Sequence, residues 1–264
     1  CIEFDFTTLE EVENIVNSSE ISQDDMVIEI GPGLGTLTKY LLEKAGKVLC
    51  IELDRKMIEI LEDRFEKYSN FEIINDDVLK VDLNKIIKEN KENEKIKNVK
   101  IVANLPYYIT TPIIMKLLEE KLDIESITVM IQKEVADRLI EIPSGKNTGA
   151  ITYTIYYYCD SEKIMEVPNS SFIPEPEVTS EVIKMKIRKE PVVKVENPKV
   201  MFMIIKSAFM QRRKTLLNAL TNAQVFISKQ EGIKILNKLG LNENVRAENL
   251  TIENYAELAK EISK

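Results

Sequence analysis

This chain carries the sequence Met26-Val27-Ile28-Glu29-Ile30-Gly31-Pro32-Gly33-Leu34-Gly35, in which an apolar run leads directly into a loop with three glycines. The apolar run 26–30 predicts a buried strand, and the pattern of Thr36–Lys44 predicts a helix after the loop. Glycines at such a junction let the backbone turn tightly and approach a ligand closely. We therefore expect a β-loop-α unit with a ligand-binding loop.

The alternation of strand-like and helix-like patterns continues along the chain. Further strands are predicted at Val48–Leu53, Phe71–Ile74, Val99–Ala103, Ile127–Ile131, Lys163–Val167 and Glu181–Ile187, and helices at Lys56–Lys67 and Thr111–Glu120. Alternating elements imply a mostly parallel sheet. Asn84–Lys97 is polar and is expected to be a helix end and a loop, and the proline-rich residues 168–176 are expected to be irregular. Ala150–Cys159 is ambiguous, because its β-branched and tyrosine content favours a strand that the pattern does not settle.

A domain boundary is predicted within Lys189–Pro198, which has two prolines and little pattern. This gives domains at residues 1–188 and 189–264. In the second domain, periodicity predicts helices at Lys199–Leu220, Lys229–Leu239 and Ile252–Ile262.

Composition limits the possible classes of function. The chain has 264 residues, of which 44% are hydrophobic and 30% charged, as in ordinary globular proteins. Its apolar runs are shorter than the ~20 residues that span a bilayer. It begins at Cys1 without an initiator Met, so the sequence does not exclude a targeting segment ahead of Cys1. The three cysteines favour a reduced, cytoplasmic setting, and the absence of histidine argues against His-based triads and His-ligated metal sites.

The charge of the chain gives two opposing indications about nucleic acid. The net charge of −8 argues mildly against a nucleic-acid partner. Residues 199–230, however, contain no acidic residue and six basic ones, namely Lys199, Lys206, Arg212, Arg213, Lys214 and Lys229. A local basic surface can neutralise phosphates, although charge alone fits a solvated helix face at least as well.

The segment Asn104-Leu105-Pro106-Tyr107 follows the predicted strand Val99–Ala103. Ligands of open α/β sheets bind outside the carboxyl ends of the strands. The Asn104 side-chain oxygen and the carbonyl of Leu105 or Pro106 could accept both N–H groups of an exocyclic amino group, and the Tyr107 ring could stack on the base. A strand-ending turn explains the same residues when they are taken alone.

A nucleoside cofactor is the simplest ligand for the glycine loop. Glu52 ends the second predicted strand, where a carboxylate can accept hydrogen bonds from both ribose hydroxyls. Asp77 follows the third strand and could bind an adenine amino group, or act as a helix cap. The spacing Gly-Pro-Gly-Leu-Gly is not the G-x-G-x-x-G of NAD enzymes. Phe172 is a second aromatic candidate, expected to be exposed on the proline-rich loop, with a place in the core as the alternative.

Six segments in this order resemble the KsgA (RsmA) family of small-subunit (16S) ribosomal RNA adenine dimethyltransferases. They are Ile28–Thr38, Asn104–Ile109, Gln132–Leu139, Phe172–Val178, Gln211–Leu216 and Arg246–Leu250. The resemblance implies a class I, Rossmann-like methyltransferase with a seven-stranded sheet whose last strand is antiparallel, a small helical C-terminal domain, and a helix at Ala150–Cys159. The family usually has a basic N-terminal segment ending in a Gln-Asn-Phe-Leu-type motif, which closes over the cofactor and contacts RNA. No such motif appears before Thr8 in this sequence, and a chain without it is expected to have lower cofactor affinity and activity.

The resemblance also implies the ligands and the site residues. The cofactor would be S-adenosylmethionine, and the substrate two adjacent adenosines in the 3′-terminal hairpin of small-subunit rRNA, each dimethylated on N6. The cofactor would be bound by Gly31, Gly33, Gly35, Glu52, Asp77, Val78 and Asn104. The catalytic residues would be Asn104, Leu105, Pro106, Tyr107 and Phe172, and the RNA-binding residues Lys206, Arg212, Arg213 and Lys214.

Three alternatives remain at this point. An Erm-type large-subunit rRNA methyltransferase shares the fold and the chemistry, but Gln211–Leu216 and Arg246–Leu250 favour the small-subunit family. A ribosome-assembly factor with secondary methylation is a second alternative, and an NAD-dependent oxidoreductase a third. We expect a monomer in small-subunit biogenesis, without a metal or a membrane partner.

Overall fold

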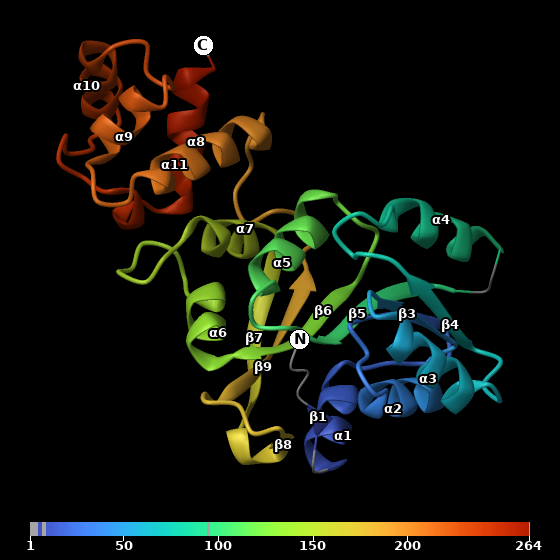
Figure 1. Cartoon of the computed structure of the whole chain (residues 1–264). Coiled ribbons are helices and arrows are strands. Elements are labelled where there is room, and N and C mark those ends of the chain that lie inside the picture. Colours follow the sequence, from blue (N-terminus) through green and yellow to red (C-terminus); the bar gives the residue numbers. More distant parts are fainter. Residues whose placement is uncertain (1–4, 7–8, 94–95, 264) are drawn as a thin grey trace. The chain divides into compact units, whose positions relative to one another are not determined.

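The computed structural model describes residues 5–6, 9–93 and 96–263 (Figure 1). The chain divides into two compact units, one of Cys1–Ala136 with Asp160–Ile187 and one of Asp137–Cys159 with Arg188–Lys264. The division after Ile187 lies next to the predicted boundary, whereas residues 137–159 group with the C-terminal residues. The prediction about the segment before Thr8 falls largely outside the described residues.

The first unit is built on a seven-stranded sheet. Its strands, in spatial order, are β4 (Phe71–Asn75), β3 (Lys47–Glu52), β2 (Asp25–Ile30), β5 (Asn98–Asn104), β6 (Ser126–Gln132), β9 (Ser180–Ile187) and β7 (Cys159–Val167). Neighbouring strands from β4 to β6 pair in parallel, and β9 pairs antiparallel with β6. The predicted sheet, with its antiparallel last strand, is confirmed.

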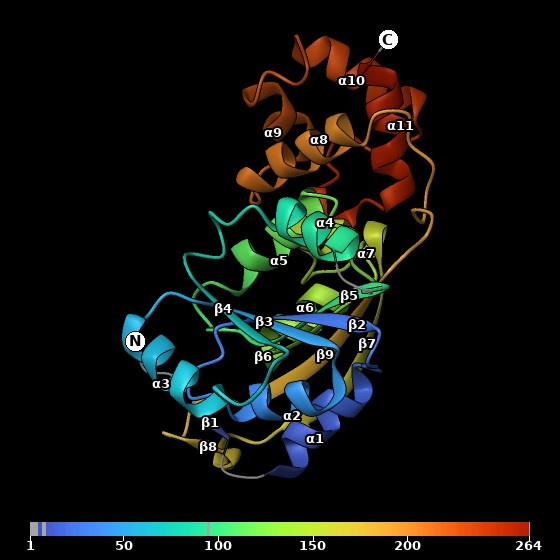
Figure 2. The same ribbon diagram turned by 90° about the vertical axis from the view of Figure 1, so that its right-hand side faces the viewer.

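Helices cover both faces of this sheet. Figure 2 shows α1 (Leu9–Ser18), α2 (Thr36–Lys44) and α3 (Arg55–Phe65) on one face, and α4 (Leu83–Asn93) and α5 (Thr110–Glu119) on the other. The short helix α6 (Lys133–Ile140) follows β6. Because both faces are covered, every residue of β2 is buried, which explains why the central strands are continuous apolar runs.

The proline-rich segment is more regular than predicted. It contains a 3-10 turn, η1 (Asn169–Ser171), and a two-residue strand, β8 (Phe172–Ile173), which pairs antiparallel with β1 (Asp5–Phe6). The expectation of irregular structure there is therefore wrong for five residues. Pairing with a distant segment, which local sequence does not specify, supplies the regular structure.

The second unit is helical. It contains α7 (Ala150–Tyr158), α8 (Pro198–Met210), α9 (Leu216–Asn222), α10 (Lys229–Lys238), the 3-10 turn η2 (Ala247–Asn249) and α11 (Ile252–Ile262). Its core includes Tyr153 and Tyr255, whose rings pack edge to face 5.0 Å apart. Both hydroxyls donate to the Ala247 carbonyl, at 3.2 and 3.0 Å, so they fix the turn within Arg246–Leu250. The helix that the resemblance implied at residues 150–159 is confirmed except at Cys159, which begins β7.

The predicted helix Lys199–Leu220 is wrong in its middle. It is two helices, α8 and α9, joined by a turn in which the Lys214 N–H donates to the Gln211 carbonyl at 2.8 Å. Thr215 begins α9 as its N-cap and accepts from the Asn218 N–H. Arg212, Arg213 and Lys214 therefore lie on a turn and not on a helix. No helix in the described ranges is long and apolar enough to cross a membrane.

Candidate functional site

The register of the parallel strands places three predicted site residues, Glu52, Gly31 and Asn104, in a row. Glu52 is opposite Asn75 at the end of β4, and Ile51 is opposite Ile30 at the end of β2. Glu29 is opposite Val102 in the parallel pair β2–β5. Two residues further along each strand, Gly31 is therefore opposite Asn104. Neighbouring strands are about 4.8 Å apart. The order β4-β3-β2-β5 therefore lines up the residues that end these strands at the carboxyl edge of the sheet.

The glycine loop has the conformation that requires glycine. Gly31, Gly33 and Gly35 have φ angles of 66°, 57° and 82°, in the left-handed region. Among the described residues other than its chain neighbours, no heavy atom lies within 4 Å of the position that a Cβ of residue 31 would take, so a ligand can approach the backbone there. A Cβ at residue 35 would lie 2.7 Å from Leu61 and Phe65 of α3, so packing explains that glycine.

Glu52 presents a buried acceptor that the described part of the chain does not use. The side chain is 5% exposed. Its Oε1 accepts from the N–H groups of Leu53 at 2.7 Å and Asp54 at 2.9 Å, which fixes the carboxylate. Its Oε2 is buried and has no hydrogen-bond partner among the described residues. Buried polar atoms are almost always hydrogen-bonded, so this oxygen fits a missing donor such as a ribose hydroxyl.

The residues after β4 are less decisive. Asp77 Oδ1 accepts from the Leu79 N–H at 3.0 Å, and its Oδ2 lies 3.8 Å from Lys80 Nζ. This is the loop and cap geometry that was the alternative for Asp77, and Val78 beside it is buried. Contact of either residue with a cofactor stays a prediction.

The segment Asn104–Tyr107 leaves the sheet in a fixed conformation. Asn104 is the last residue of β5, and the Leu105 N–H donates to the Met130 carbonyl at 3.2 Å. The Pro106 carbonyl accepts from the Ile109 N–H and from Thr110 Oγ1, at 3.2 and 3.1 Å. Because these donors already occupy Pro106, the Leu105 carbonyl is the better of the two predicted acceptors for an incoming amino group.

The two aromatic candidates have different surroundings. The Tyr107 hydroxyl lies 2.7 Å from Ser180 Oγ, the first residue of β9. Phe172 is 3% exposed and packs in a core cluster that includes Val12 and Ile15 of α1. The expectation that Phe172 is exposed is therefore wrong, and the alternative, a ring in the core, holds in this structure. Its role beside a base stays a prediction.

Sequence patterns missed Glu29, a buried acid next to the glycine loop. It is 1% exposed, and its Oε2 accepts from Thr38 Oγ1 of α2 at 2.6 Å and lies 3.5 Å from Cys50 Sγ. Burial raises the pKa of Glu29 to about 7. The carboxyl group therefore links strand β2 to helix α2 on either side of the loop.

In the native chain, the free energy of unfolding is expected to fall as pH rises from about 4.5 to 7, and Glu29→Gln is expected to abolish this pH dependence. In that window the unfolded chain ionises Glu29 while the folded chain keeps the proton, because the folded pKa is raised from 4.5 to about 7. The native free energy of unfolding thus drops by roughly 3 kcal/mol as pH rises. Urea unfolding from pH 4 to 8.5 measures this, and parallel curves for the native chain and the variant would contradict it.

The predicted RNA-binding residues lie on the second unit. Arg213, Lys214 and Lys206 are exposed. Arg212 Nη2 donates to the Lys146 and Thr148 carbonyls, at 3.0 and 2.9 Å. Part of the Arg212 guanidinium therefore holds the loop before α7, which sequence did not indicate.

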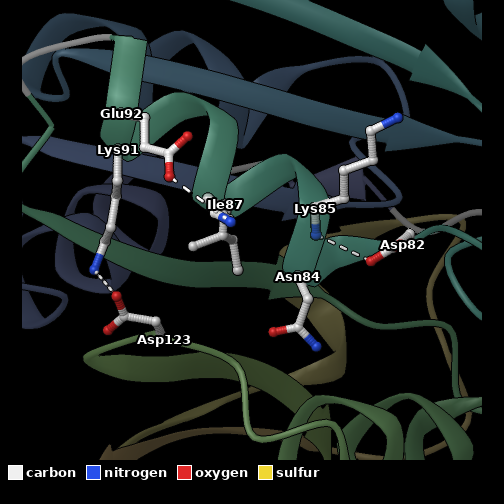
Figure 3. Close-up of a pocket in the computed structure, with 8 residues that line it drawn as sticks. Asp82, Asn84, Lys85, Ile87, Lys91, Glu92 and Asp123 are labelled. Carbon is white, nitrogen blue, oxygen red and sulfur yellow. Dashed lines mark hydrogen bonds and ion pairs between the residues drawn. The ribbon is translucent and has the colours of Figure 1, made fainter.

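A hollow of about 600 Å³ lies elsewhere on the first unit, beside α4 (Figure 3). Its lining comes from α4 and from the segments before α4 and β6, and not from the strand ends. Its charges pair with one another, as in Lys91 with Asp123 at 2.5 Å and Lys88 with Glu92 at 3.9 Å. It is therefore not part of the site.

The sheet order is that of a Rossmann-like methyltransferase fold. The sequence profile described as "Ribosomal RNA adenine dimethylase" matches residues 7–264. The chain belongs to that family, and it is an enzyme.

Similar proteins agree with this assignment. The chain is 50% identical over 252 residues to "Ribosomal RNA small subunit methyltransferase A" of Alkaliphilus metalliredigens, with 96% of this chain and 87% of the relative covered. It is 47% identical to the protein of that name in Clostridium acetobutylicum, with coverages of 95% and 88%. The structure of a dimethyladenosine transferase from Plasmodium falciparum matches with a TM-score of 0.80 and 26% identity, over 98% and 97% of the two chains. The 23S rRNA methyltransferase ErmE shares the fold, with a TM-score of 0.70, 20% identity, and coverages of 98% and 99%.

Proposed function

We propose that this protein transfers methyl groups from S-adenosylmethionine to the N6 atoms of two adjacent adenosines in the 3′-terminal hairpin of small-subunit rRNA. The observation that carries the proposal is the row of strand-end groups, with the unused Oε2 of Glu52 on one side of the glycine loop and Asn104 on the other. The names of the similar proteins support rRNA as the substrate.

The residues at the carboxyl edge fit this cofactor. Glu52 would accept from the ribose hydroxyls through Oε2, and the open backbone at Gly31 would lie against the methionine part. When bound, the cofactor supplies an electrophilic methyl group on a positively charged sulfur. Asp77 and Val78 would contact the adenine.

The chain's own residues would activate the acceptor nitrogen by position. The adenine amino nitrogen is a poor nucleophile because its lone pair is delocalised into the ring. Asn104 Oδ1 and the Leu105 carbonyl would accept its two N–H bonds and favour a tetrahedral nitrogen whose lone pair points at the methyl group. Since the leaving group is a neutral thioether, no strong base is needed, and the nitrogen loses its proton to water after transfer. Catalysis then rests on positioning and electrostatics.

Tyr107→Ala is expected to weaken engagement of the RNA more than binding of the cofactor. Base stacking on an aromatic ring contributes ~1–3 kcal/mol, and the target base must leave its own stack. We expect a raised KM for RNA and a nearly unchanged Kd for S-adenosylmethionine. Steady-state methyl transfer and calorimetric titration measure the two, and equal losses in both would contradict the stacking role.

The RNA backbone would be bound by the second unit. This unit presents exposed cationic side chains at Lys206, Arg213 and Lys214. Arg212 would add the guanidinium donors other than Nη2, which binds the loop before α7. Such contacts neutralise phosphates without reading sequence. Such a local basic surface would let the protein bind RNA although its net charge is negative.

Transfer of tritiated methyl groups to unmethylated small subunits tests the proposal. We expect four methyl groups per particle, on two adjacent adenosines, and none on large-subunit RNA. Label on large-subunit RNA alone would favour the Erm-type alternative. Absence of label with retained binding to immature small subunits would favour an assembly factor.

A further inference from the structure

The Tyr107 hydroxyl has a buried partner on a distant strand. It lies 2.7 Å from Ser180 Oγ, although the two residues are 73 positions apart in sequence. Ser180 is fully buried, while Tyr107 is only partly buried. The hydroxyl end of the phenol ring is thus anchored inside the protein.

The topology of the sheet explains why these residues meet. Since β9 runs antiparallel to β6, its first residue, Ser180, lies at the carboxyl edge, opposite Gln132. The Lys133 N–H donates to the Thr179 carbonyl at 3.0 Å and closes this end of the strand pair. On the other side of β6, the bond from Leu105 to Met130 holds the start of the segment that carries Tyr107. The serine and the tyrosine therefore meet across the end of β6, each on a fixed backbone.

We propose that Ser180 is a positioning residue that holds the Tyr107 ring in the orientation in which its face receives the target adenine. This role rests on the proposed function. Free rotation about the Cα–Cβ bond would let the ring leave the site, so that binding a base would also have to immobilise the ring. The hydrogen bond to a buried strand residue pre-orients the ring before RNA arrives, which lowers that entropic cost.

The test compares methyl transfer to unmethylated small subunits by the native chain, Ser180→Ala, Tyr107→Phe and the double variant. Each single variant removes one hydroxyl and keeps the ring. We expect each to lower kcat/KM for the RNA about fivefold, the factor that a net hydrogen bond contributes. The double variant should fall no further, because both changes remove the same bond. The Kd of S-adenosylmethionine should stay within about twofold in all variants.

Ser126→Ala is the matched control. Ser126 is also a buried serine of the β6–β9 pair, but it begins β6 at the opposite edge of the sheet, where it faces Lys186. We expect native kcat/KM for this variant even if its unfolding midpoint falls as much as that of Ser180→Ala. Loss of kcat/KM in step with the unfolding midpoint in all variants would overturn the positioning role.

Two further outcomes separate this inference from the proposed function. Independent losses in the two single variants, giving about 25-fold in the double variant, would overturn the role of the Tyr107–Ser180 bond alone. Native activity in Ser180→Ala would do the same. A native chain that methylates no small subunit would overturn the proposed function, and the role of Ser180 with it.

Discussion

Asn104→Ala should lower the turnover number for methyl transfer about 100-fold, while the Kd of S-adenosylmethionine changes by less than about fivefold. Removal of one preorganised polar group at a reacting centre typically costs 10²- to 10³-fold in kcat. Asn104 ends β5, and its backbone is fixed by the pairing of β5 with β6, so truncation removes the acceptor and leaves the neighbouring chain in place. Single-turnover transfer with saturating RNA and cofactor measures the chemical step.

The control for this variant lies on the same strand. Asn98→Ala removes the same side chain at the first residue of β5, where Asn98 Nδ2 donates to Asp25 Oδ1 at 3.0 Å, at the opposite edge of the sheet. It should reduce stability and leave turnover native. Near-native turnover in Asn104→Ala would eliminate the proposed activation of the amino group.

Glu52→Gln should weaken binding of S-adenosylmethionine about 100-fold, with little change in the fold. Glutamine keeps an oxygen for the Leu53 and Asp54 N–H groups but replaces the unused acceptor with an NH₂ donor. Hydrogen bonds to a charged group contribute about 1.5–3 kcal/mol each, and 1.4 kcal/mol is tenfold in Kd. Calorimetric titration of the free protein measures the effect without RNA.

Glu72→Gln is the matched change on the neighbouring strand. Glu72 lies on β4 and pairs with Lys47 at 2.8 Å on the surface. We expect its cofactor affinity to be native. If both variants bind the cofactor equally well, the ribose does not bind at Glu52, and the unused oxygen needs another partner.

The sequence correctly predicted the parallel strands and the residues at their ends, because local patterns mark both. The five parallel strands are predicted to within one residue at every end. For the central strands the reason is that a strand covered on both faces must be largely apolar. Gly31, Glu52 and Asn104 followed from the same reasoning, since each residue sits where a strand stops. Their alignment at one edge then follows from the sheet order.

The errors, and the ambiguity at residues 150–159, arise where distant contacts override local preference. α7 is rich in residues that favour strands, but six of its nine residues are buried, and Tyr153 and Tyr157 belong to the core of the helical unit, so packing outweighs propensity. The turn between α8 and α9 has one local sequence signal, Thr215, which is the N-cap of α9. Local sequence did not indicate that the Phe172 ring points into the core. Ser180 meets Tyr107 only because β9 pairs antiparallel with β6.

The strand order has a consequence for how the specificity of this enzyme is divided. The chain builds β2, β3 and β4 outward in one direction, then crosses back and builds β5, β6 and β9 in the other. The proposed donor groups, except Asn104, lie before residue 80, and the proposed acceptor groups after residue 103. With these proposed roles, the half of the sheet formed by β2, β3 and β4 would bind the methyl donor, and the half formed by β5, β6 and β9 would bind the acceptor. We therefore expect that substitutions in the half formed by β5, β6 and β9 change the nucleic-acid acceptor more readily than they change the use of the methyl donor.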